Sequence, residues 1–325
     1  MKKVLLLGVA VFAVGSFGIA AQAAQQKPAV KVAVCHKTSS KKKPYVRVVV
    51  SGAALKLAQK SADDIVPAPK TCPQVLLTAA GGGVEIDVKL LGIAEQPDLG
   101  DPDGTGTAVL RLRQNQGRVC FKLDAQNIAA ATAAHIHKGG PEESGPAVVP
   151  LAAPGASGSG AGCVAAARVV VNGILADKAG YYVNIHTGEF ANGAVRGQLA
   201  PVAGISLFTS SMAGANEKPN PADPNGTGAG QFFVNADKGK LCYALAVKNI
   251  TLPSLAAHIH KGDSNTSGPV VIPFTQPGAN GQSSGCVTAD AALLKDLVAN
   301  PAGYYSNVHT SQFAAGAVRG QLTVS

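Results

Sequence analysis

Six of the seven histidines in this 325-residue chain fall into two sets of three with matching local sequences. The first set lies in AHIHKG and YYVNIHT, and the second lies in AHIHKG and YYSNVHT, 123 residues further along. Histidine is the commonest metal ligand and also carries protons near neutral pH. We name the sets site 1, with His135, His137 and His186, and site 2, with His258, His260 and His309.

The spacing predicts that each set converges on one point. Alternate residues of a strand point to the same face, so the two histidines of each AHIH sequence face one way. The third histidine joins them if its strand is a neighbour. Three imidazoles without a thiolate suit copper or zinc and leave one coordination position open. The competing interpretation is that these histidines only hydrogen-bond within the fold.

An arginine and a glutamate also recur with each set. Arg196 and Arg319 both lie in GAVRGQL, ten residues after the last histidine of their set. A returning hairpin would place the guanidinium beside the metal, where it could attract a small anionic substrate. The alternative is a structural arginine that donates to loop carbonyls. Glu95 and Glu217 are candidates to orient a ligand histidine from behind, or else are surface carboxylates.

The segments that must position the histidines are predicted to be β-strands, and they occur in two copies. Residues 84–199 match residues 205–322, and each copy holds short alternating segments bounded by Gly, Asn, Asp and Pro. This pattern predicts an all-β chain of two tandem antiparallel, Greek-key-like β-sandwich domains. One short helix is expected at Ala289–Ala299, with a weaker counterpart at Ala165–Ala176. Pro201–Gly204 is a linker short enough for the domains to touch.

The cysteines follow the duplication. Six cysteines allow fifteen complete pairings, but each repeat contains two at corresponding positions and two precede the repeats. An oxidising compartment favours disulfides, and no C-x-x-C spacing indicates a cysteine metal site. The predicted disulfides are Cys120–Cys163, Cys242–Cys286 and Cys35–Cys72.

The first residues read as a targeting segment. Met1-Lys2-Lys3, an apolar run and the small-x-small pattern of residues 21–23 indicate a secretory signal peptide over 1–23. No later apolar run approaches the about 20 residues that span a bilayer, so no transmembrane segment is expected. The predicted protein is exported, either periplasmic or extracellular, which argues against nucleic acid as a partner. The expected divisions are a basic module at 24–78 and domains at 79–200 and 204–325.

The positive charge is confined to the N-terminal segment. Of the formal charge of +9, residues 24–75 carry +8 and residues 76–325 carry −1. The segment, densest at Lys41–Lys43, is either a solvated arm or an attachment to an anionic envelope surface.

The ordered motifs E-x-P, D-P-x-G-T-G, A-H-I-H-K-G, Y-Y-x-N-x-H-T and G-A-V-R-G-Q-L resemble the CHRD domain, in two copies over residues 80–325. Chordin-type proteins of animals are secreted binders of growth factors, but this resemblance implies a fold more than a function. The order of histidine pair, later histidine and arginine is also similar to copper/zinc superoxide dismutases. A counterpart of their metal-bridging histidine and of their zinc ligands is missing, so that resemblance implies a copper-only site.

Three functions remain open from the sequence. The first is a copper-only, superoxide dismutase-like oxidoreductase. The second is a non-catalytic protein that holds metal or binds the envelope or matrix. The third is a zinc hydratase or hydrolase, which is the weakest because no general base recurs beside the histidines.

Overall fold

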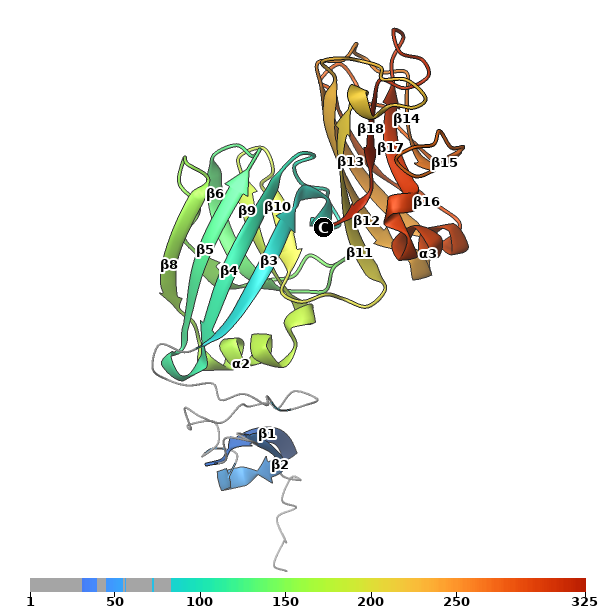
Figure 1. The fold of residues 1–325 in the computed structure, drawn as a ribbon. Coiled ribbons are helices and arrows are strands. Elements are labelled where there is room, and N and C mark those ends of the chain that lie inside the picture. Colours follow the sequence, from blue (N-terminus) through green and yellow to red (C-terminus); the bar gives the residue numbers. More distant parts are fainter. Residues whose placement is uncertain (1–30, 40–44, 55, 57–71, 73–82) are drawn as a thin grey trace, which may run out of the picture.

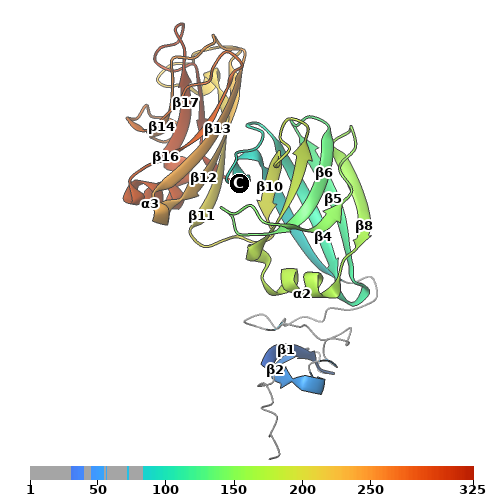
Figure 2. The same cartoon turned by 180° about the vertical axis from the view of Figure 1, so that it is seen from behind.

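The computed structural model describes residues 31–39, 45–54, 56, 72 and 83–325. Two barrel-like sheets of antiparallel strands follow one another in this part of the chain, preceded by a small hairpin (Figures 1 and 2). The expected signal peptide and the lysine run Lys41–Lys43 lie outside the described residues. No helix in the described ranges is long and apolar enough to cross a membrane.

The N-terminal hairpin pairs β1 (Lys31–Lys37) with β2 (Tyr45–Ser51). A disulfide joins Cys35 on β1 to Cys72, and both cysteines are buried. An isolated two-stranded hairpin is marginal in water, so this cross-link supports the small module.

The first barrel contains eight strands: β3 (Val84–Leu91), β4 (Thr105–Arg113), β5 (Arg118–Gln126), β6 (Ala131–Lys138), β7 (Ala147–Leu151), β8 (Ser159–Ala165), β9 (Tyr181–Thr187) and β10 (Val195–Gln198). They form one curled sheet in the order β7-β6-β9-β10-β3-β4-β5-β8. Its two edge strands contact each other, which nearly closes the barrel.

The second barrel repeats this order with β11 (Ile205–Ala213), β12 (Thr227–Asn235), β13 (Lys240–Lys248), β14 (Ala256–Lys261), β15 (Val270–Phe274), β16 (Gln282–Thr288), β17 (Tyr304–His309) and β18 (Val318–Gln321). A short strand, β19 (Thr323–Val324), pairs with β11. The predicted all-β tandem is therefore confirmed. The structure adds that each domain is one continuous curled sheet, because every strand is hydrogen-bonded to its neighbours in series.

Alternating sequence builds the barrel walls. In β5 the odd-numbered residues from Val119 to Ala125 are buried, while Arg118, Lys122 and Gln126 are exposed. Burial of a large aliphatic or aromatic side chain contributes about 1.5–3 kcal/mol, so a wall of such positions favours one register. In β13 seven consecutive residues are buried, which shows that both of its faces are covered.

Short helices close the ends and turns. The α-helices are α2 (Arg168–Ala176) and α3 (Ala291–Ala299), as the sequence predicts, and the 3-10 turns are η1 (Gly92–Ala94), η2 (Gln114–Gln116), η3 (Lys178–Gly180), η4 (Gly214–Asn216), η5 (Ala236–Lys238) and η6 (Pro301–Gly303). The Asp290 side chain accepts from Leu293 N and caps α3. Ala167 precedes α2 and gives no such cap, which explains the weaker helix signal there.

All three predicted disulfides are present. Cys120 lies opposite Cys163 on β5 and β8, and Cys242 lies opposite Cys286 on β13 and β16. The equivalent placement in both barrels follows from the duplication.

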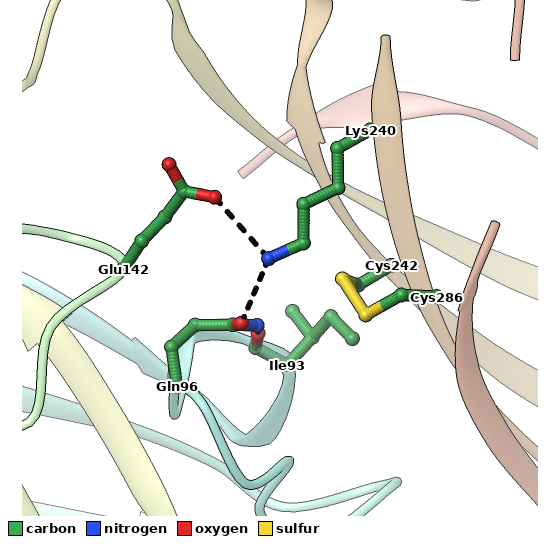
Figure 3. The surroundings of a disulfide bond; sticks show 6 residues. All are labelled: Ile93, Gln96, Glu142, Lys240, Cys242 and Cys286. Atoms are coloured by element: carbon green, nitrogen blue, oxygen red, sulfur yellow. Dashed lines mark hydrogen bonds and ion pairs between the residues drawn. A yellow bond between two sulfur atoms is a disulfide. The ribbon is translucent and has the colours of Figure 1, made fainter. Parts of the chain in front are cut away.

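The two barrels touch, as the short linker predicts. Ile93 of η1 is fully buried among Phe233, Cys242 and Ala244 on the outer face of the second barrel. Figure 3 shows Ile93 beside the Cys242–Cys286 disulfide. Gln231 accepts from Ile93 N at 3.1 Å and donates to a carbonyl of the first barrel at 2.9 Å. This contact explains why β13 is covered on both faces.

Candidate metal centres

The third histidine of each set lies on a strand adjacent to the histidine pair, as predicted. In site 1 the pair is on β6 and His186 is on β9, where Asn184 is directly opposite His135. Site 2 has the same pairing between β14 and β17. One nitrogen from each histidine of a set lies within 4.8 Å of the other two, and His135 Nδ1 is 3.1 Å from His186 Nε2.

Backbone carbonyls determine which imidazole nitrogens of site 1 carry the proton and which keep a lone pair for a metal. His137 Nδ1 lies 2.8 Å from Gly145 O, and His186 Nδ1 lies 3.0 Å from Ala191 O. A carbonyl oxygen only accepts, so each Nδ1 must carry the proton. The Nε2 atoms of both neutral imidazoles then hold unprotonated lone pairs. The fold therefore selects the tautomers that a metal requires.

Site 2 reproduces this arrangement. His260 Nδ1 lies 2.9 Å from Gly268 O, and His309 Nδ1 lies 3.1 Å from Ala314 O. Among the described residues, the opposite nitrogens, His260 Nε2 and His309 Nε2, are buried without a hydrogen-bond partner, and so is His258 Nδ1. Buried polar atoms are nearly always paired, so three orphaned nitrogens at one site require a reason.

The protein keeps all six imidazoles in the neutral form. Burial lowers the pKa of every histidine in both sites, and repulsion between neighbouring imidazolium ions lowers several further. The pKa of His258 falls to about 4. Neutral imidazole is the metal-binding form, so these sites are ready to bind at neutral pH.

The residues present fit a small transition-metal ion. Metal–nitrogen bonds of about 2.0–2.1 Å place the ligand nitrogens about 3–4 Å apart. The observed limit of 4.8 Å is slightly wider, and small imidazole rotations would close it. The donor set contains only imidazole nitrogens, which suits copper or zinc better than magnesium or calcium.

A stack of three side chains supports each pair of histidines. Tyr182 lies parallel to His137 with ring centroids 4.8 Å apart, and the Arg196 guanidinium lies 3.4 Å from the centroid of Tyr182. The Tyr182 hydroxyl accepts from Gly145 N, so the same tyrosine contacts the loop that fixes His137. Site 2 has the same stack with Tyr305.

The arginines fit the structural alternative. Arg196 is 1% exposed and donates to Glu143 O at 3.0 Å and to Gly140 O at 2.6 Å. Arg319 is 1% exposed and donates to Asp263 O. Each guanidinium fastens the loop after the histidine pair and lies behind a tyrosine. The geometry gives no support to the expectation that these arginines attract an anion.

The glutamates lie behind the sites and reach the histidines through an asparagine. Burial raises the pKa of Glu95 to about 8, partly offset by Arg196 and a hydrogen bond from Asn184. Asn184 Oδ1 in turn lies 3.0 Å from His186 Nε2. A Cβ on Gly193 would lie 2.1 Å from Glu95 Oε1, and this residue has a φ of +142°, so only glycine fits above the carboxyl group. The two glutamates were expected to orient a ligand histidine, and the structure shows that Glu95 reaches the histidine only through Asn184.

The sequence interpretation missed the tyrosine, the asparagine and the glycine carbonyl of each site. Tyr182 and Asn184 belong to the repeated Y-Y-x-N-x-H-T motif, and Gly145 to a repeated S-G-P. Their recurrence was a usable signal, because side chains at alternate positions of one strand share a face with the histidine.

The fold and the sites define a tandem β-barrel protein with a three-histidine centre on the wall of each barrel. The profile of the CHRD domain matches residues 86–199 and 208–322, and the chain belongs to this family. No curated protein matches the sequence. The resemblance to copper/zinc superoxide dismutases therefore rests only on the order of a few residues.

Proposed function

We propose that this CHRD protein is exported and binds one copper ion in each barrel, through the three histidines of site 1 and of site 2. The observation that carries this proposal is the group of three orphaned, buried imidazole nitrogens in site 2. In site 1, carbonyls at equivalent positions select two of the corresponding atoms, His137 Nε2 and His186 Nε2. Disulfides in both barrels and in the N-terminal hairpin are consistent with an oxidising compartment, periplasmic or extracellular.

Copper is favoured over zinc by the ligands. Imidazole binds both ions, but first-row affinities peak at Cu²⁺, and no recurrent carboxylate is directly placed to act as a general base on a zinc-bound water. Copper bound to histidine can exchange one electron, which is the chemistry that superoxide dismutation would require. The chain's contribution would be to hold neutral imidazoles rigidly and to keep water away from one side of the ion.

Binding of copper without catalysis is better supported than superoxide dismutation. The arginines are buried and bonded to loop carbonyls, so they are not exposed cations that could attract superoxide. A zinc hydratase or hydrolase is the least supported alternative. The basic N-terminal segment at 24–78 is proposed to attach the protein to an anionic envelope surface, which would be the binding role of the chain.

Metal analysis of the disulfide-intact protein tests this function. After copper loading and dialysis we expect two ions per chain by mass spectrometry, one after His137→Ala, and none after His137→Ala with His260→Ala. His36→Ala, which alters the one histidine outside both sites, should retain two ions. Stoichiometric copper without superoxide turnover would establish metal holding, whereas turnover lost in the double variant would establish catalysis. Copper bound equally by the double variant would refute both.

A further inference from the structure

A fourth side chain faces the histidines in each site. Asn184 precedes His186 by two residues, so both point to the same face of β9, and it is directly opposite His135 across the ladder. Asn184 is 1% exposed, and its counterpart Asn307 is 3% exposed. Asn184 Oδ1 lies 3.0 Å from His186 Nε2, an atom already identified as a metal-facing nitrogen.

No proton is available between these two atoms. His186 Nδ1 holds the single imidazole proton and donates it to Ala191 O, so Nε2 presents a lone pair. An amide oxygen is also only an acceptor. Two acceptors at 3.0 Å repel each other in a buried site unless a cation lies close to both. This contact therefore indicates that the amide oxygen belongs to the metal site.

In site 2, other atoms also indicate that the asparagine oxygen belongs to the metal site. Asn307 Oδ1 is buried and has no hydrogen-bond partner among the described residues, like the His258 Nδ1 and His309 Nε2 atoms beside it. The amide has a defined direction, because Asn307 Nδ2 donates to Glu217 Oε2 at 3.2 Å. With its nitrogen held by the carboxyl group of Glu217, the amide directs its oxygen away from that carboxyl group, and Asn307 lies opposite His258 in the strand ladder.

We propose that Asn184 and Asn307 are the fourth protein ligands of the two metal ions, through Oδ1, and that Glu95 and Glu217 are positioning residues that hold the amides. This inference rests on the proposed function. It changes the site from three nitrogens with an open position to three nitrogens and one neutral oxygen. A tetrahedral ion would then be enclosed by protein, which suits holding of the metal over hydrolytic chemistry.

The experiment measures copper affinity one site at a time. Site 1 is isolated in the full-length, disulfide-intact protein by His258→Ala with His260→Ala, and the Cu²⁺ dissociation constant is obtained by competition with a chelator. In this background Asn184→Ala should weaken binding at least tenfold and shift the Cu²⁺ electron paramagnetic resonance spectrum. Asn184→Asp, which keeps an oxygen at the same position, should restore the affinity. Asn192→Ala, on the hairpin that follows β9, is the matched control and should change neither quantity.

The outcomes separate the two claims. If the background protein itself binds no copper, the proposed function of site 1 fails. If it binds copper through His137 but Asn184→Ala changes the dissociation constant less than twofold with an unchanged spectrum, only the ligand assignment is overturned. Tighter binding after Asn184→Ala would also overturn it, because that result means the amide nitrogen faces the metal. Since a purely structural asparagine would lower the melting temperature without altering affinity, melting is measured for each variant with and without copper.

Discussion

Glu142 connects the two barrels, and its removal should weaken their docking. The carboxylate accepts from Lys238 Nζ at 2.5 Å, Lys240 Nζ at 3.2 Å and Asn235 Nδ2 at 3.0 Å, all from the second barrel. Figure 3 shows Lys240 between Glu142 and Gln96, near the Cys242–Cys286 disulfide. The Glu142 side chain is 20% exposed, compared with 65% for Lys238 and 31% for Lys240.

These exposures set the size of the effect. The exposed ion pair between Lys238 and Glu142 should contribute no more than about 0.5 kcal/mol to the free energy of docking, because solvent screens such pairs. The less exposed bonds from Lys240 and Asn235 should contribute about 1 kcal/mol each. Glu142→Ala is therefore expected to weaken docking by about 2 kcal/mol, which is about thirtyfold in the docking equilibrium.

The pH dependence of this contact follows from the same groups. Burial raises the pKa of Glu142, but its hydrogen bonds and charge interactions with the two lysines outweigh burial, so the pKa lies below its usual value. A carboxyl group with a lowered folded-state pKa stabilises the protein above its unfolded-state pKa. That contribution is lost as the pH falls through the folded-state value. Docking should thus be strongest near neutral pH and weaken in acid.

Hydrogen exchange measured by mass spectrometry tests the docking effect. In Glu142→Ala, the amides of β13 and of η1 should exchange faster, while those of β6 and β14 stay protected. Glu143→Ala is the control, since it removes the same charge from the adjacent position, where the side chain accepts only from Gly140 N. Equal exchange at β13 in the two variants would refute the reasoning.

Four further substitutions probe burial, loop support and helix capping. The raised pKa of Glu95 lets the folded state keep a proton that the unfolded state loses above about pH 4.5. The stability of the wild-type protein should therefore fall as the pH rises from there to about 8. Glu95→Gln should therefore gain stability over wild type across that range, by urea denaturation. Arg196→Lys should lose more than about 2 kcal/mol and weaken site 1 copper binding, since buried carbonyls lose their donors. Asp290→Ala should cost about 1 kcal/mol in thermal denaturation, and Ala167→Asp should recover a similar amount at α2.

The sequence predicted the features that depend on local periodicity and on duplication. His135 and His137 share a face because strands repeat every two residues, and the disulfides were assigned because each repeat contains one pair. The helix expected at Ala289–Ala299 was indicated by the helical spacing of its residues, and the structure places it at Ala291–Ala299. Each of these inferences needs only residues that are close in sequence or equivalent between repeats.

The role of the arginine could not be predicted in this way. A hairpin that returns Arg196 to the site was expected, and the residue does return, but it lies on the far side of Tyr182. Only the path of the loop from Gly140 to Gly145 shows that the carbonyls of Gly140 and Glu143 accept from the guanidinium. The direction of the Asn184 amide likewise depends on Glu95, which is remote in sequence.

Comparison of the repeats separates two kinds of position. Positions that are identical in both include those around the candidate metal sites, namely the histidines, Tyr182 with Tyr305 and Asn184 with Asn307. Positions that differ on the outer face of the barrels mark the contact between them: Phe233 and Ala244 are buried against the first barrel, whereas Arg111 and Lys122 occupy the same places on the first barrel and are exposed. A charged residue in one copy and an apolar one in the other indicates that only the second copy has a partner there. The face with Arg111 and Lys122 is thus adapted to water, whereas the equivalent face of the second barrel is adapted to contact with the first.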